Sequence, residues 1–288
     1  MNYKNLIKNR KSTRDYKPDA VDDRKLQALI SYFHQATKLI PEIKMEIFLL
    51  QNGNDVFERL DGKAGYNGRM IKAPGYILIA SEDKDGYMEN TGFVGENMIL
   101  KAADEGIDTC WITFESSSLI KDALELDTDK EITGIIAVGY GIDKKKVLHT
   151  IAIGDNYSKA DIQIIKDNTS FRYSVEDIVF LKEWGRHADY SILEQRGIAE
   201  AFTYLRLAPS TLNHQPWKFI IDDSAMVLTI KDNKDTNIKE EKIDAGIVML
   251  YFYLLLSETI YTPQWYLGKT EKDYKIPENY RVVSWCAL

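Results

Sequence analysis

A short run near the N-terminus concentrates side chains that could bind a phosphate group. From Arg10 to Arg14 the sequence reads Arg-Lys-Ser-Thr-Arg, which places three cations and two hydroxyl groups within five residues. Arginine makes paired, charge-assisted hydrogen bonds to phosphate oxygens, and a serine or threonine hydroxyl adds a neutral donor. The run could therefore bind a phosphate dianion. A solvated basic surface near a chain end would have the same composition, so the residues alone leave both interpretations open.

A second polar segment, residues 208–217, reads Ala-Pro-Ser-Thr-Leu-Asn-His-Gln-Pro-Trp. Its two prolines favour an extended backbone. Between them lie closely spaced hydroxyl and amide groups, and an amide carries a donor and an acceptor side by side, which suits the pyrimidine edge of a flavin. The same polar groups could instead satisfy the backbone of a loop that joins a helix to a strand. Both interpretations again remain open.

Helix and strand patterns alternate around these two segments. Apolar spacing predicts a helix that begins after Asp22 or Asp23 and carries Leu26 to Phe33, and a capping box at Ser174 predicts another that runs to about Trp184. Further helices are expected at 91–105, at 192–205 and from residue 244 on. Strands are expected at 46–50, 76–80, 109–114, 134–140, 217–221 and 226–230, and the polar stretch 143–169 is expected to be an extended connection.

The order of elements restarts after residue 185, which indicates an internal duplication. Residues 36–48 align with 208–220 at an offset of 172. Further along, Gly92 precedes Trp111 by 19 residues, as Gly246 precedes Trp265, at an offset of 154. Both of these windows hold an apolar helix that leads to a strand with tryptophan. The repeat therefore predicts two related halves, of which the second is the shorter.

Composition excludes several classes of function. The 288 residues carry a net charge of −7, whereas a nucleic-acid-binding protein would present a broad cationic surface. The longest apolar run, 247–256, is too short to span a bilayer, and the N-terminal sequence has no signal-peptide core. The two cysteines have no metal-ligand spacing, so no metal site is expected. We expect a cytoplasmic protein that binds neither nucleic acid nor membrane.

Both polar segments resemble motifs of the FMN-dependent nitroreductase superfamily. The run from Arg10 to Tyr16 resembles that superfamily's N-terminal Arg-x-Ser-x-Arg-x-aromatic motif. Residues 209–217 resemble its Pro-Ser-x-x-Asn-x-Gln-Pro-Trp motif at six fixed positions. Residues 106–112 are similar to its strand of small residues followed by Trp, and 134–140 and 171–178 resemble its late strand and basic tail. The resemblance extends over nearly the whole chain.

The arrangement of the motifs departs from that of an ordinary family member, which carries both in one subunit and forms a homodimer with two FMN sites. Here the first half has the phosphate motif but reads Thr-Lys-Leu-Ile-Pro-Glu-Ile-Lys-Met where the Pro-Ser loop would stand. The second half has an intact Pro-Ser loop, but residues 191–198 contain one basic residue, Arg196. The resemblance therefore implies a fused pseudo-dimer, monomeric in solution, with one competent site and one decayed site.

The implied fold is α+β and nitroreductase-like, with two pseudo-symmetric copies of a helix-flanked, mainly antiparallel sheet. We expect the first copy to occupy residues 1–185 and the second 186–288, with the halves interwoven. By resemblance, Arg10, Ser12, Arg14 and Arg172 would hold the FMN phosphate and ribityl chain. The residues expected near the flavin ring are Asn67, Thr113, Phe114 and Glu115 from the first half and Pro209, Ser210, Thr211, Asn213 and Gln215 from the second.

The resemblance implies an FMN-dependent oxidoreductase with NADH or NADPH as co-substrate. Hydride would pass through flavin N5 by a ping-pong scheme to a nitroaromatic, a quinone or a similar small acceptor. The cofactor would carry the chemistry, so no protein residue is assigned as catalytic. Two alternatives remain open: a dedicated dehydrogenase or dehalogenase of the same superfamily, and a non-catalytic module that binds flavin or another ligand. The sequence does not distinguish NADH from NADPH or identify the acceptor.

Overall fold

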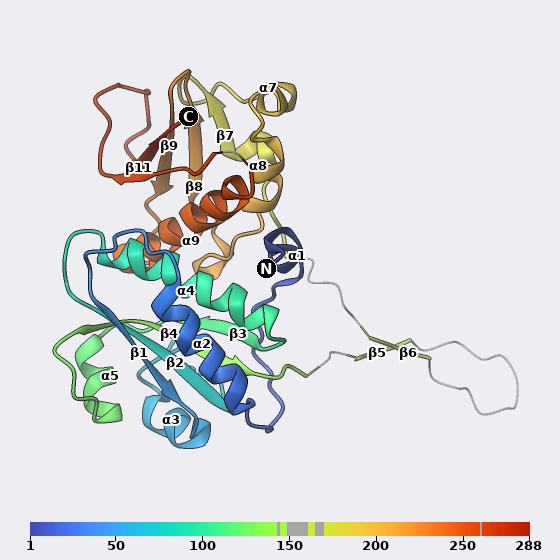
Figure 1. The fold of residues 1–288 in the computed structure, drawn as a ribbon, viewed down its shortest axis with the longest axis vertical. Coiled ribbons are helices and arrows are strands. Elements are labelled where there is room, and N and C mark those ends of the chain that lie inside the picture. Colours follow the sequence, from blue (N-terminus) through green and yellow to red (C-terminus); the bar gives the residue numbers. More distant parts are fainter. Residues whose placement is uncertain (143–144, 149–160, 165–169, 260) are drawn as a thin grey trace, which may run out of the picture.

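The computed structural model describes residues 1–142, 145–148, 161–164, 170–259 and 261–288, and contains two main antiparallel sheets with helices around them (Figure 1). The first sheet has the order β1-β2-β4-β3, and all three of its strand pairs are antiparallel. Its strands are β1 (Met45–Leu50), β2 (Gly75–Ser81), β3 (Asp108–Ile112) and β4 (Glu131–Gly139). The uninterrupted burial of β2 and nearly all of β4 is explained by their central positions, where helices cover both faces.

The second sheet repeats this order and adds one strand. Its order is β10-β11-β9-β8-β7, so that β8-β9-β11-β10 corresponds to β1-β2-β4-β3. The strands are β7 (Val179–Leu181), β8 (Trp217–Ile221), β9 (Ala225–Lys231), β10 (Trp265–Leu267) and β11 (Tyr280–Ala287). The additional strand, β7, lies parallel to β8 and comes from the chain that follows the first copy. A segment that precedes residue 185 thus completes the sheet of the second copy.

The helices flank the two sheets and fill the space between them (Figure 1). They are α1 (Tyr3–Asn9), α2 (Asp23–Gln35), α3 (Gly53–Leu60), α4 (Tyr87–Asp104), α5 (Ser117–Leu124), α6 (Val175–Ile178), α7 (Tyr190–Gln195), α8 (Ala199–Leu205) and α9 (Ile238–Ser257). A separate pair of antiparallel strands, β5 (Lys145–Leu148) and β6 (Asp161–Ile164), follows β4. The rest of the predicted connection at 143–169 lies outside the described residues.

The long helices α4 and α9 cross at two glycines that correspond in the repeat. A Cβ atom at Gly92 would lie 2.1 Å from the carbonyl oxygen of Ile243, and one at Gly246 would lie 2.0 Å from that of Glu89. Gly246 lies 154 positions after Gly92, and Ile243 lies 154 positions after Glu89, so the two contacts are reciprocal, as at a two-fold axis. The predicted duplication and the two pseudo-symmetric copies are therefore confirmed.

Most predicted elements form, and two differences have local causes. The capping box at Ser174 is present, but its helix ends at Ile178 rather than near Trp184, because the next three residues are buried in β7 beside β8. The helix expected at 192–205 is divided into α7 and α8 at Gly197, whose φ of 71° is incompatible with a continuous helix. Two short helices, α3 and α5, were not predicted. Within the described residues no helix is long and apolar enough to cross a membrane.

Candidate functional site

The run that resembles a phosphate motif lies against the start of β3. Ser12 forms a parallel bridge with Thr109, and the backbone N–H of Thr13 donates to the Thr109 carbonyl oxygen over 2.9 Å. Nη1 of Arg10 lies 3.4 Å from the Ser12 hydroxyl oxygen, and Nη1 of Arg14 lies 3.5 Å from the Ser12 carbonyl oxygen. The edge of the first sheet therefore fixes the backbone from which both arginines and the serine extend.

Arg10 is a buried cation. Its side chain is 7% exposed, and its Nε lies 3.7 Å from Oε1 of Glu96 on α4, a carboxylate that is completely buried. At that separation the two charges attract, but Nε makes no hydrogen bond within the described structure. Burial raises the pKa of Glu96, and the charge of Arg10 opposes that rise. A buried guanidinium with an unused donor is suited to an anionic ligand.

The basic tail carries a second arginine, Arg172, which is close enough to Arg10 for the two charges to interact. Nη1 of Arg172 donates to the Asn213 side-chain oxygen, and its Nη2 lies 3.5 Å from the carbonyl oxygen of Leu207. Burial lowers the pKa of Arg172, and the like charges of Arg10 and Arg206 lower it further. Because these cations repel one another, the cluster is electrostatically prepared for a dianion.

The Pro-Ser loop, residues 209–217, is hydrogen-bonded to this basic tail, residues 171–178. The Gln215 side chain donates to the carbonyl oxygen of Phe171 over 3.2 Å and accepts from the backbone N–H of Tyr173 over 3.1 Å. The Ser210 hydroxyl accepts from the backbone N–H of Gln215 over 2.8 Å. Backbone φ is positive at Gln215 and Asn213, at 49° and 59°, a conformation that costs free energy in residues other than glycine. The loop of the second half is therefore held in one shape against a segment that precedes residue 185.

Asp244, which the sequence did not single out, anchors the start of this loop. It is 2% exposed on α9, and its carboxylate accepts from the backbone N–H of Thr211 over 3.0 and 3.1 Å. Burial raises its pKa well above the usual value, and the hydrogen bonds from Thr211 act against that rise. Its counterpart 154 residues earlier, Asn90, accepts from the backbone N–H of Ile40 over 3.0 Å. The repeat offset, applied to polar residues of the two helices, could have identified this pair.

The residues expected at the flavin ring from the first half form a second group, at the end of β3. The carbonyl oxygen of Thr113 accepts from the backbone N–H of Gly65 over 2.7 Å, and Phe114 forms a bridge with Ala64. This places the 62–68 loop, which includes Asn67, beside the end of β3; Asn67 is exposed and has a φ of 52°.

The charge of Glu115, one residue of this group, acts on the first turn of α9. The pKa of Glu240, in the first turn of that helix, is raised by burial and also by the charges of Glu241 and Glu115. Glu240 lies one helical turn before Asp244, which holds Thr211. The start of α9 therefore holds Asp244, which anchors the Pro-Ser loop, and Glu240, whose pKa responds to the charge of Glu115 after β3.

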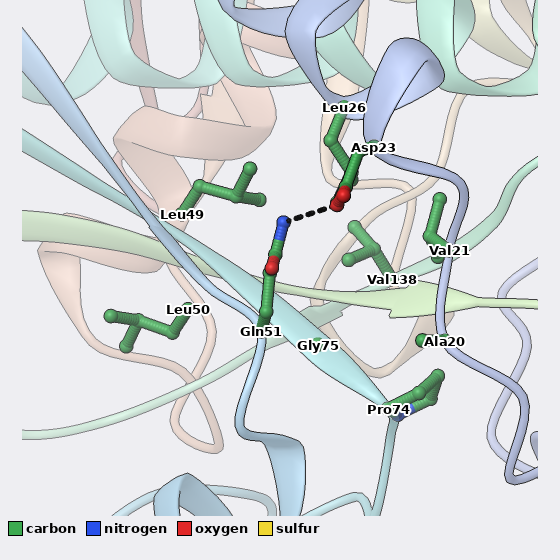
Figure 2. Close-up of a pocket in the computed structure, with 10 residues that line it drawn as sticks. All are labelled: Ala20, Val21, Asp23, Leu26, Leu49, Leu50, Gln51, Pro74, Gly75 and Val138. Atoms are coloured by element: carbon green, nitrogen blue, oxygen red, sulfur yellow. Dashed lines mark hydrogen bonds between the residues drawn. The ribbon is translucent and has the colours of Figure 1, made fainter.

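Two hollows lie at a different end of the first sheet. One, of about 470 Å³, is lined by Arg14, Lys17 and Lys72 among others. The other, of about 40 Å³, has the apolar side chains of Leu26, Leu49 and Val138 and a hydrogen bond of 3.1 Å from Gln51 to Asp23 (Figure 2). Neither contains a residue of the Pro-Ser loop. Arg14 therefore lines the larger hollow, and its Nη1 also approaches the carbonyl oxygen of Ser12, whose hydroxyl group Nη1 of Arg10 approaches.

The position equivalent to the end of β3 in the second half is occupied by apolar side chains. Leu267 lies 154 residues after Thr113, and a Cβ atom at Gly86 would lie 2.4 Å from Cδ1 of both Leu267 and Ile40. Arg196, the basic residue of the second half's would-be phosphate segment, donates to the carbonyl oxygen of Asp222 over 2.6 Å and pairs with Asp223. Within the described residues, this second position therefore has apolar side chains instead of a polar group after the strand, and its arginine is already bound to two aspartates.

Comparisons with known proteins agree with this architecture. The model of a family described as "Putative TM nitroreductase" matches residues 2–255. A solved structure of a nitroreductase described as putative, from Thermotoga maritima, is 18% identical, with a TM-score of 0.57 over 100% of this chain and 93% of that one. This similarity confirms the fold. The comparison with curated proteins finds no match.

Two shorter solved structures align with about half of the chain. A nitroreductase family protein from Clostridium novyi is 20% identical over 49% of this chain and 87% of its own, with a TM-score of 0.44. A nitroreductase with bound FMN from Bacteroides fragilis is 19% identical over 55% of this chain and 99% of its own, with a TM-score of 0.43.

Proposed function

Because the chain belongs to the family described as "Putative TM nitroreductase", we propose that it is an FMN-dependent NAD(P)H oxidoreductase. It reduces nitroaromatic compounds, quinones or similar small acceptors by a ping-pong scheme, as a monomer in the cytoplasm. The observation that supports this most is the link between the two half-motifs: Arg172 of the first half donates a hydrogen bond to Asn213 of the Pro-Ser loop and is close enough to Arg10 for that residue's charge to lower its pKa. One composite site thereby draws on both halves of the chain.

The charges and donors at this site fit a flavin mononucleotide. Its phosphate is suited to a buried cation, and the Arg10 side chain is 7% exposed, with its Nε directed to Glu96 at 3.7 Å and without a hydrogen bond within the described structure. In this proposal Arg10, Ser12, Arg14 and Arg172 hold the phosphate and ribityl chain. The ring is bounded by Asn67, Thr113, Phe114 and Glu115 from the first half and by Pro209, Ser210, Thr211, Asn213 and Gln215 from the second.

The chain's own residues act by position and charge. When bound, FMN would supply a ring that accepts hydride from NADH or NADPH and passes it to the acceptor. The arginine cluster neutralises the phosphate, and Asp244 and Gln215 hold the Pro-Ser loop so that its donors stabilise negative charge on the pyrimidine edge. No side chain is required to transfer a proton, so we assign none as catalytic.

The proposal includes one competent site per chain, with the halves divided at residues 1–185 and 186–288 and interwoven through β7. Two features support a second site that takes no flavin. The apolar side chains of Ile40 and Leu267 both lie against Gly86, and Arg196 is bound to Asp222 and Asp223. Titration of the purified protein with FMN should therefore saturate near one flavin per chain. A value near two would contradict the single composite site.

Reduction of the bound flavin tests the enzymatic part of the proposal. In anaerobic stopped-flow mixing, NADH or NADPH should bleach the oxidised flavin absorbance, and a quinone or nitroaromatic compound should then restore it. A flavin that binds but stays oxidised with both nucleotides would exclude the reductase and leave a flavin-binding protein. A protein that binds no flavin would exclude the proposed cofactor altogether.

A further inference from the structure

A buried hydrogen-bond network connects the second half of the chain to the phosphate motif of the first. Oε1 of Glu96 accepts from the hydroxyl of Tyr251 on α9 over 2.8 Å, and its Oε2 accepts from the indole N–H of Trp111 on β3 over 2.9 Å. Tyr251 and Glu96 are 0% exposed. The carboxylate therefore has one donor on each oxygen, and Oε1 also faces Nε of Arg10 at 3.7 Å.

The network has no counterpart at the second position of the repeat. The residue 154 positions after Glu96 is Leu250, which cannot accept a hydrogen bond through its side chain. The corresponding tryptophan, Trp265, donates to the backbone carbonyl oxygen of Met249 over 3.1 Å instead. The carboxylate thus occurs only behind the half that carries the Arg-x-Ser-x-Arg run, where a cation needs to be held.

We propose that Tyr251 is a positioning residue for cofactor binding: it fixes the Glu96 carboxylate, which holds Arg10 in place for the flavin phosphate. This inference rests on the proposed function, because it requires that Arg10 bind the phosphate of FMN. Because Tyr251 lies on α9 and Glu96 lies on α4, the phosphate subsite then requires that these two helices pack against each other. The second half then contributes to both ends of the cofactor, with the Pro-Ser loop at the ring and Tyr251 behind the phosphate.

A buried charge is costly in free energy unless hydrogen bonds or an opposite charge stabilise it. Burial raises the pKa of Tyr251 well above its usual value, so the phenol remains protonated and acts as the donor to Glu96. Two donors and a neighbouring cation stabilise the buried carboxylate. The carboxylate in turn offsets the repulsion between Arg10 and Arg172 and restrains Nε of Arg10, which leaves its Nη groups for a ligand.

The test compares FMN with riboflavin, which has the same ring and no phosphate, by fluorescence titration of the full chain. Tyr251→Phe keeps the packing and the net charge and removes the hydroxyl. We expect its dissociation constant for FMN to rise about tenfold, as for loss of a hydrogen bond to a charged group, with riboflavin binding unchanged. Tyr32→Phe is the matched control. It removes a partly buried hydrogen bond of 2.9 Å from the Tyr32 hydroxyl to Asn97, the residue after Glu96, and no hydrogen bond of Glu96 itself.

Three results would overturn the inference while leaving the proposed function intact. They are unchanged FMN binding in Tyr251→Phe, equal weakening of FMN and riboflavin, and equal weakening of FMN in the Tyr32→Phe control. If Tyr251→Phe does not fold, Glu96→Gln decides: selective loss of FMN binding supports positioning, whereas tighter FMN binding would mean that the carboxylate only repels phosphate. A wild-type protein that prefers riboflavin or binds neither would instead contradict the proposed function itself.

Discussion

Gly92 of α4 and Gly246 of α9 each bring the backbones of the two helices into direct contact, with 2.1 and 2.0 Å respectively between a hypothetical Cβ and a carbonyl oxygen of the other helix. Real Cβ atoms do not approach backbone oxygen so closely, so the two helices would have to separate if either glycine were replaced. The crossing is the centre of the pseudo-dimer, and α4 and α9 carry Glu96, Asp244 and Tyr251. The site therefore depends on this contact.

Gly246→Ala is expected to lower the free energy of unfolding by about 2–4 kcal/mol, because the helices must move apart in a close-packed core. Urea denaturation of the variant and the wild type measures this difference. Gly185→Ala serves as the control: its φ is +81° and nothing lies within 4 Å, so it should cost only about 1 kcal/mol. Equal costs for the two variants would show that α4 and α9 are not in such close contact.

Asp244→Asn is expected to preserve the loop anchor and to change its pH dependence. Asn90 performs the same task for Ile40 with an amide, so an amide oxygen at 244 can accept from Thr211. The pKa of Asp244 is raised in the folded protein, so its contribution to stability is present below the ordinary aspartate pKa and is lost as pH rises through the folded value.

Relative to Asp244→Asn, the wild type should therefore lose stability as the pH rises above the ordinary aspartate pKa of about 4, on the order of 1 kcal/mol for each unit by which the pKa is raised. Thermal melts of both proteins across a pH range above that value measure the difference. Asp244→Ala removes the acceptor and should be about 1–3 kcal/mol less stable than Asp244→Asn at any pH in the range. A pH-independent gap between wild type and Asp244→Asn would mean that Asp244 keeps its ordinary pKa.

Arg172→Ala is expected to weaken FMN binding about tenfold or more, because it removes a buried cation of the cluster and the hydrogen bond that holds Asn213. Arg196→Ala removes a cation of the second half that is engaged with Asp222 and Asp223, and should leave FMN binding unchanged. Fluorescence titration measures both constants. If both variants bind FMN equally well, the phosphate is not held at the junction of the two halves.

Much of this fold could be predicted from periodicity and repeat spacing, and the failures share a cause. The strands at 217–221 and 226–230 form as expected, because their apolar runs are long and bounded by turn residues. Residues 179–181 are a short apolar run that a helix could also contain, and only pairing with β8, whose sequence lies about 40 residues away, makes them a strand. Local sequence does not contain that partner.

Some residues of the candidate site could likewise be predicted from the sequence, and others could not. Motif resemblance predicted Arg10, Arg172 and Gln215 as candidates, because each stands within a segment that resembles a motif of the superfamily. Glu96 and Asp244 lie inside apolar helices, where the pattern of neighbours indicates a core rather than a site. Their roles depend on contacts across the crossing of α4 and α9, and the repeat offset alone gives a sequence-based indication of such contacts.

Arg14→Ala and Ser210→Ala together test whether the two halves share one cofactor. Arg14 belongs to the first half, and the Ser210 hydroxyl accepts from Gln215 in the Pro-Ser loop of the second. Both variants should raise the FMN dissociation constant, Arg14→Ala through loss of a cation and Ser210→Ala through loss of a hydrogen bond of about 1 kcal/mol, which is several-fold. Thr203→Ala, which removes a hydroxyl bonded within α8, is the control and should bind FMN as the wild type does. If only Arg14→Ala weakened binding, the Pro-Ser loop would lie outside the site, and the composite of two halves would be wrong.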